Sequence, residues 1–132
     1  MGGRGQLSFG EALMSEKLGH NARLDAIAAA VKWYRFEILL RRLAPDGPGR
    51  PPYAPLLMLK ALLLQQWYGL SDAGLEEALN DRMSFRRFCG LSLEAASPDH
   101  TTICRFRERL RAAGVLERLF DEFERQLEKA GG

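Results

Sequence analysis

Residues 53–68 constrain the fold more than any other stretch, because they form a helical pattern that is apolar on most sides. The apolar positions are Leu56, Leu59, Leu63 and Trp67 in one stripe, widened by Leu57, Leu62 and Leu64. Pro55 fits the first turn of such a helix, and Gly69 fits its C-terminal end. A helix with so little polar surface has to be covered by other elements, which predicts the central core helix of a bundle.

Two helical patterns precede this stretch. The spacing of apolar residues predicts one helix over about residues 21–31 and a second over about residues 33–43. Asn21 is a suitable N-cap for the first. A single bent helix over both ranges is the alternative.

Four more helical patterns follow the central stretch. Ser71 can cap a short helix, and a second short helix stops at Gly90. A third begins near residue 100, and Gly114 separates it from a last helix with an apolar seam from Leu116 to Leu127. No window shows the period-two alternation of strands, so the sequence predicts an all-α, compact multi-helix bundle.

The clearest linker is at residues 44–52, where prolines and glycines disfavour both helix and central strand. It divides the chain into an N-terminal helical segment, residues 1–43, and a larger helical part, residues 53–130. A chain of 132 residues has the size of one ordinary domain. We therefore expect both parts to belong to one compact unit.

Composition points to a globular protein outside the membrane. Hydrophobic residues make up 46% and charged residues 27% of the chain, and the apolar blocks are shorter than a membrane-spanning helix. The N-terminus lacks a sustained apolar region followed by a small-residue cleavage site. We expect a cytoplasmic protein without a membrane partner.

Basic charge is local rather than general in this chain. The formal net charge of +2 is too small to argue for nucleic acid by itself. The clustered arginines are Arg82, Arg86, Arg87, Arg105, Arg107, Arg109 and Arg111. Such a run is most often the solvated face of a helix, and this interpretation stays open beside a binding role.

Few residues offer catalytic or metal-binding chemistry. Cys89 and Cys104 lack Cys-x-x-Cys spacing, so we expect free, partly buried thiols and neither a zinc site nor a disulfide framework. His20 and His100 accompany no recognisable nucleophile, metalloprotease or phosphate-loop motif. We expect no catalytic residue, no metal and no cofactor.

Residues 98–111 combine a sharp helix start with a high density of arginine. Pro98 cannot continue a preceding helix, while Asp99 or Thr101 can accept from the first N–H groups of a new one. The positions at helical spacing that mark its buried side are Ile103, Phe106 and Leu110. The residues that project away are Thr101, Arg105, Glu108, Arg109 and Ala112. One face therefore packs, and the other can contact a partner.

Two short helices and this arginine-bearing helix, over about residues 71–113, have the order of a helix-turn-helix-like unit. In such units the second helix enters the major groove, while other cationic side chains hold phosphates. The predicted groove-facing residues are Thr101, Thr102, Arg105 and Arg109. The predicted backbone contacts are His100, Arg86 and Arg87. The implied partner is double-stranded DNA.

Five motifs follow one another along the chain: residues 49–53 (GRPPY), 63–72 (LLQQWYGLSD), 75–79 (LEEAL), 84–91 (SFRRFCGL) and 98–107 (PDHTTICRFR). In this order they closely resemble the N-terminal domain of bacterial insertion-sequence transposases of the insertion-sequence-five family. The resemblance is strongest from Gly49 to Leu110 and looser over residues 6–33 and 116–131.

The resemblance implies DNA binding in the service of transposition. In such transposases the N-terminal helical domain is taken to recognise the terminal inverted repeats of the mobile element. A following RNase H-like domain of the DDE type supplies three acidic residues that bind divalent metal for strand cleavage and transfer. No strand-like segment with an acidic residue occurs in this sequence, so we expect the chain to be catalytically inactive alone.

A second hypothesis is that the chain assembles transposase subunits or acts as a regulatory, inhibitory fragment. It would then form a homo-oligomer or associate with a full-length transposase, through the Leu116 to Leu127 seam and the helix around Trp67. The same seam can instead clamp across the bundle of a single chain.

Overall fold

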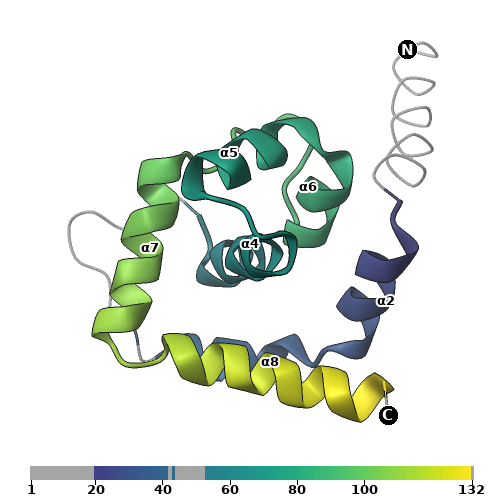
Figure 1. The fold of residues 1–132 in the computed structure, drawn as a ribbon, viewed down its shortest axis with the longest axis vertical. Coiled ribbons are helices and arrows are strands. Elements are labelled where there is room, and N and C mark those ends of the chain that lie inside the picture. The colour runs from purple at the N-terminus through teal and green to yellow at the C-terminus, as the bar shows by residue number, and fades with distance from the viewer. Residues whose placement is uncertain (1–19, 42, 44–52, 132) are drawn as a thin grey trace, which may run out of the picture.

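The computed structural model describes residues 20–41, 43 and 53–131, which form seven helices and no strand. In chain order the helices are α2 (Ala22–Ala30), α3 (Trp33–Leu40), α4 (Pro55–Tyr68), α5 (Asp72–Asp81), α6 (Met83–Cys89), α7 (His100–Ala112) and α8 (Leu116–Gly131) (Figure 1). The predicted all-α, multi-helix fold is confirmed. Within these residues, none of the helices has the length and apolar character of a membrane span. The expected linker at residues 44–52 lies outside the described residues, so the division into two parts stays a prediction.

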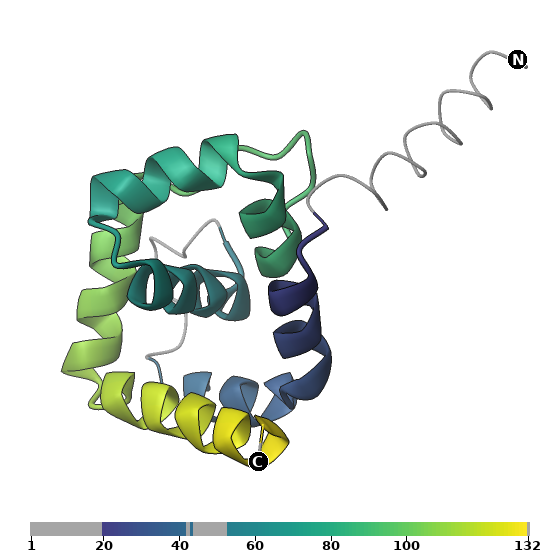
Figure 2. The ribbon, with the colours of Figure 1, turned by 45° about the vertical axis from the view of Figure 1, so that its right-hand side comes forward.

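The central helix α4 is surrounded by the other helices (Figure 1, Figure 2). Its buried side chains are Met58, Leu59, Ala61, Leu62, Leu63 and Leu64. Pro55 stands in its first turn, and Gly69 ends it in the left-handed region, with a φ of 61°. Helices α3, α5, α6 and α7 all contact α4, as predicted for a core helix.

Helices α2 and α3 are separate, which decides against the single bent helix. Oδ1 of Asn21 caps α2 by accepting from the N–H of Leu24 at 3.0 Å. The backbone then becomes extended at Val31 before α3 begins. Helix α3 ends at Leu40 rather than at residue 43, because the N–H of Leu43 turns back to the Leu40 carbonyl at 3.0 Å.

Helix α8 closes an aromatic cluster at the edge of the bundle. The Phe123 ring is buried, and its centroid lies 4.6 Å from that of Trp67 and 6.2 Å from that of Phe36. Leu119 is fully buried as well, and α8 contacts α2, α3 and α7. The apolar seam is therefore used inside one chain, which confirms the clamp interpretation.

The helix-turn-helix-like unit expected over residues 71–113 is not distinct in the arrangement of helices. Only Arg82 separates α5 from α6, whereas residues 90–99 separate α6 from α7. A helix-turn-helix normally has a turn of about three to four residues. Three-residue connections containing a glycine at positive φ instead join α4 to α5 and α7 to α8. The unit stays a prediction.

Arg86, a predicted phosphate contact, lies in the interior. The residue is 4% exposed, and its guanidinium donates to the carbonyl oxygens of Leu79, Ser92 and Ala95. These carbonyls belong to α5 and to the connector before α7, so Arg86 fastens the connector to the bundle. A side chain enclosed in this way does not reach a phosphate, which makes Arg86 a structural residue.

Replacing Arg86 with alanine is expected to lower the free energy of unfolding by about 2 to 4 kcal/mol, because three carbonyl oxygens lose a charged donor. The matched control is Arg87→Ala, which removes a surface ion pair and should cost less than about 1 kcal/mol. Urea denaturation followed by circular dichroism measures both. Equal losses in the two variants would contradict the structural role of Arg86.

Candidate nucleic-acid interface

The helix that carries most of the predicted contacts, α7, begins where the sequence indicated. Oδ1 of Asp99 accepts from the N–H of Thr102 at 2.8 Å and caps the helix. The three residues predicted to form its buried side are buried, namely Ile103, Phe106 and Leu110. The inner face of α7 is therefore held against the core, and its orientation is fixed.

An exposed stripe runs along the outer face of α7. It consists of Thr101, Cys104, Arg105, Glu108 and Arg111. Thr102 and Arg109, two predicted groove contacts, are partly buried at the border of this stripe. Arg111 pairs with Glu108 one turn earlier, whereas Arg105 forms no ion pair with any described carboxylate. Arg105 is therefore the cation of this face best placed to contact a partner.

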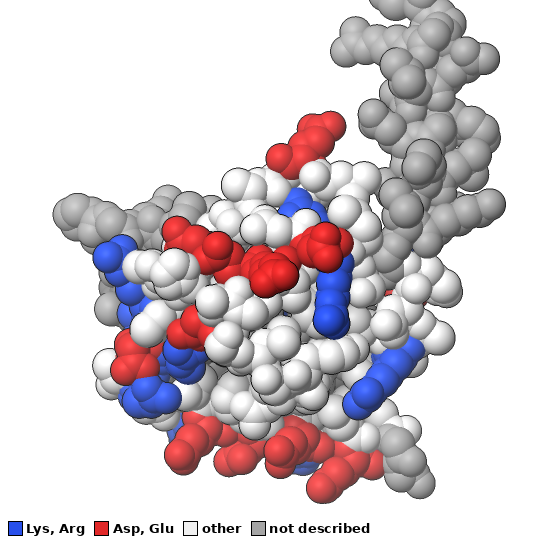
Figure 3. Space-filling view, turned by 45° about the horizontal axis from the view of Figure 1, so that its top comes forward, with Lys and Arg blue, Asp and Glu red and all other residues white. Residues whose placement is uncertain are grey.

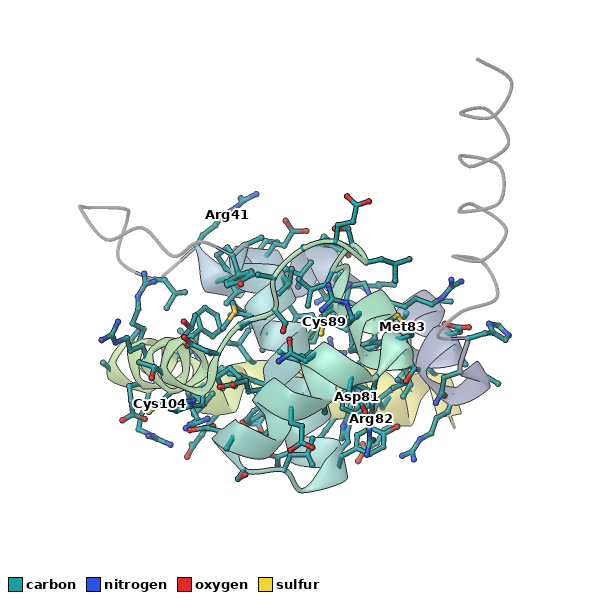
Figure 4. All side chains as sticks on the ribbon, turned by 90° about the horizontal axis from the view of Figure 1, so that it is seen from above. Arg41, Asp81, Arg82, Met83, Cys89 and Cys104 are labelled. Carbon is teal, nitrogen blue, oxygen red and sulfur yellow. The ribbon has the colours of Figure 1, made fainter. Side chains whose placement is uncertain are left out.

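The two cysteines lie in opposite environments (Figure 4). Cys89 is buried, and burial raises the pKa of its thiol to about 12. Cys104 is exposed on the outer face of α7, so the prediction that both thiols are partly buried is wrong. The reason is that Cys104 shares its side of the helix with Thr101 and Glu108 rather than with the buried seam.

A polar network, which the sequence analysis missed, holds α7 to α4 and α5. The guanidinium of Arg107 donates two hydrogen bonds to Asp72, Nη1 to Oδ1 at 2.7 Å and Nη2 to Oδ2 at 2.6 Å. Nε2 of Gln65 donates to the same Asp72 Oδ1 at 2.7 Å. The Arg107 side chain holds the pKa of Asp72 below its ordinary value. The position of Arg107, four residues after Ile103, was the signal that it borders the packed face.

The N-terminus of α7 is acidic rather than basic. Oε1 of Glu76 accepts from the backbone N–H of His100 and lies 2.7 Å from the ring Nδ1. The Glu76 carboxylate raises the pKa of His100, and the His100 ring lowers that of Glu76. Figure 3 shows acidic side chains gathered over α5 and along α8, whereas basic ones lie on the α7 side, mixed with acidic ones, and on the opposite side of the fold. His100 therefore already faces a carboxylate, and its role as a phosphate contact is not supported by its surroundings.

Arg87, the remaining predicted contact, lies away from α7. Its Nε is 3.4 Å from Oδ1 of Asp25 on α2. Helices α2 and α6 stand on one side of α4, and α7 stands on the other (Figure 1). The structure therefore brings together the predicted contacts on α7 but not those on α6.

The described residues contain no group of three histidine, cysteine or acidic side chains that could hold a metal ion. What the outer face of α7 offers is a row of hydroxyl, thiol and guanidinium groups, with one carboxylate, Glu108, that pairs with Arg111. The hydroxyl, thiol and guanidinium groups can donate to phosphate oxygens or to base edges.

The family model described as Transposase domain (DUF772) matches residues 13–109 of this chain, which is more than half of it. The chain belongs to this family. The matched range includes α2 to α6 and most of α7, with the Asp72 and Arg107 pair and the exposed Arg105. No solved structure matches this chain.

In the transposase domain, Asp72→Asn is expected to lower the free energy of unfolding by about 1 to 2 kcal/mol near pH 7, because the bidentate pair loses a charge. The pKa of Asp72 is depressed in the folded state. Its stabilisation is therefore present above the ordinary carboxyl pKa of about 3.9 and is lost as the pH falls through the lower folded value. Urea denaturation across this range should show the difference between wild type and variant shrinking in acid. A difference independent of pH would contradict this account, and Glu108→Gln, in an exposed pair, is the control with little effect.

Glu76→Gln is expected to lower the pKa of His100 towards its ordinary value, because the largest cause of its rise is removed. With Glu76 present, the pair stabilises the fold fully between the ordinary pKa of a glutamate and that of a histidine. The contribution is lost as the pH rises through the raised pKa of His100 or falls through the lowered pKa of Glu76. NMR titration of the His100 imidazole protons in the wild type and the variant measures the shift. An unchanged His100 pKa in the variant would show that Glu76 is not the cause.

Proposed function

We propose that this transposase domain is the DNA-recognition part of a DDE-type transposase of the insertion-sequence-five family, forming its N-terminal region. Its function would be to bind the terminal inverted repeats of the mobile element. The membership in a transposase family and the five ordered motifs support this assignment.

The observation that carries the proposal is the exposed stripe of α7, fixed from behind by the core. Thr101 and Arg105 project from successive turns of one face, so both can reach into a groove together. The buried seam and the Arg107 pair with Asp72 leave α7 little freedom to turn. A DNA-contacting helix that is already fixed in position loses less conformational entropy on binding than a mobile one.

The acidic N-terminus of α7 sets how DNA would approach. Asp99 and Glu76 lie at the first turn and repel phosphates, whereas Arg105 and Arg111 lie on later turns. Contacts would therefore extend along the outer face, from Thr101 towards Arg111, instead of concentrating at the helix start. Thr102 and Arg109 would contribute from the border of the stripe.

In this proposal the domain chooses a site and does not cut it. The acidic triad that the resemblance assigns to an RNase H-like domain would carry out the phosphoryl transfer with bound metal. Incubation of this chain with repeat DNA and Mg²⁺ or Mn²⁺ should leave the strands intact. A nicked product would overturn this part of the proposal.

Arg105→Ala is expected to weaken binding to a terminal inverted repeat by about 1 to 3 kcal/mol, the usual scale for one good base contact. Fluorescence anisotropy with repeat and scrambled duplexes measures affinity and preference. The matched control is Arg118→Ala, which removes an exposed arginine from α8. Equal affinity of the wild type for repeat and scrambled DNA would argue against site recognition.

Cys104 provides an independent test, because it lies in the exposed stripe while the other described thiol is buried. An alkylating reagent such as N-ethylmaleimide should modify Cys104 selectively, and bound repeat DNA should protect it. In a Cys104→Ser background, a Glu124→Cys substitution on the exposed side of α8 should stay reactive with DNA bound. Full reactivity of Cys104 under saturating repeat DNA would contradict the assignment of this face.

A further inference from the structure

A second concentration of positive charge lies at the opposite end of α8 from α7. The end of α2, the start of α3 and the last turns of α8 enclose a pocket of about 200 Å³. Its lining consists of Ala30, Lys32, Arg35, Arg125, Gln126, Lys129 and Ala130. Pockets for drug-sized ligands usually measure about 300 to 1,000 Å³, so this one suits a small group.

Every ionisable side chain of the pocket lining is cationic. Arg125 is partly neutralised, since its Nη2 lies 2.6 Å from Oε2 of Glu122 on the preceding turn. Lys32, Arg35 and Lys129 form no ion pair with any described carboxylate. Arg35 is partly offset by its Coulombic attraction to Glu122, so Lys32 and Lys129 carry most of the uncompensated charge. Cations around one concave surface repel each other, and an anion between them relieves this repulsion.

The pocket has a rigid floor made by one glutamine. Gln126 is 8% exposed, and its Oε1 accepts from the backbone N–H of Lys32 at 2.6 Å. Its Nε2 donates to Glu122 Oε2 at 2.7 Å and reaches the Lys32 carbonyl at 3.4 Å. This side chain joins residues that are 94 positions apart. The cations are therefore presented on a frame that is already formed.

The helix dipoles do not decide the sign of the electrostatic potential in the pocket. Helix α3 starts here at Lys32 without a side-chain cap, which brings the positive end of its dipole to the pocket. Helix α8 ends here and brings a negative end, in the turn that carries Lys129. Each end is equivalent to about half an elementary charge, so the two offset each other. The side chains then determine which ligand binds.

We infer that this pocket binds a phosphate group of the DNA backbone, at a distance from the exposed stripe of α7. This inference rests on the proposed DNA-binding function. The lining has cations for phosphate oxygens but neither an aromatic ring nor a carboxylate for a base. The contact therefore adds affinity and position without reading sequence.

The test is a double substitution, Lys32→Gln with Lys129→Gln, in the full chain. The control removes two charges from the other ends of the same helices, by Arg41→Gln with Arg118→Gln. Arg41 and Arg118 are exposed, and Arg41 extends outwards from the fold (Figure 4). Anisotropy at several salt concentrations, with repeat and scrambled duplexes, gives the dissociation constant and the salt dependence for each protein.

The pocket variant should bind both duplexes about tenfold or more weakly, with a salt slope smaller by about 0.9, the value for one lost phosphate contact. Its preference for the repeat should stay that of the wild type. The control should change affinity about twofold or less. Equal behaviour of the two double variants would overturn the inference and leave the proposed function intact. Equal affinity of the wild type for the repeat and the scrambled duplex would instead contradict the proposed function.

A titration with inorganic phosphate distinguishes two possible ligands of the pocket, a phosphate of the DNA backbone and a free phosphate ion. Titration with phosphate should shift the amide resonances of Lys32 and Gln126, and repeat DNA should shift the same resonances further. Shifts with phosphate alone, and none with DNA, would show that the pocket takes a free phosphate and would overturn the backbone assignment.

Discussion

Six side chains of α4 are almost completely removed from water. The need to cover them determines where most of the other helices lie. Burying one leucine-sized side chain stabilises a fold by about 1.5 to 3 kcal/mol, so a helix that is apolar on most sides has to be covered all round. Helix α7 contacts α4, and its Ile103, Phe106 and Leu110 are buried in the same core. Because those residues are used inside, the outer face of the same helix is determined too. The exposed row of Thr101 and Arg105 is in this sense a result of core packing.

Arginine density along the sequence is a poor guide to positive charge on the surface of this protein. Arg86 binds backbone carbonyls in the interior, and Arg107 holds a carboxylate at the contact between α5 and α7. Conversely, cations that are scattered in sequence meet where α2, α3 and α8 converge, around the buried Gln126. The guanidinium group serves both purposes because it has five donors in a planar fork, which suit carbonyls, carboxylates and phosphates alike. Tertiary contacts decide which of these partners each arginine finds.

Much of the fold was predictable because it depends on local patterns. The helix starts at Asn21, Ser71 and Asp99, the stop at Gly69 and the buried side of α7 all follow from capping chemistry and helical spacing. The site was less predictable. The burial of Arg86 depends on carbonyls of a connector whose path no periodicity encodes, and the Glu76 contact with His100 depends on how α5 crosses α7. The pocket beside Gln126 joins residues 94 positions apart, which spacing along one helix cannot indicate.

The range that defines the transposase domain by similarity ends at residue 109, inside α7, whereas the folded unit continues through α8. Phe123 of α8 stacks among Trp33, Phe36 and Trp67, which all belong to the matched range. A polypeptide cut at the border of similarity would leave three large aromatic rings uncovered on one side. It would expose a hydrophobic surface and have a less well packed core, and would be prone to self-association. For this protein, the end of the matched range passes through the interior of the fold rather than around it.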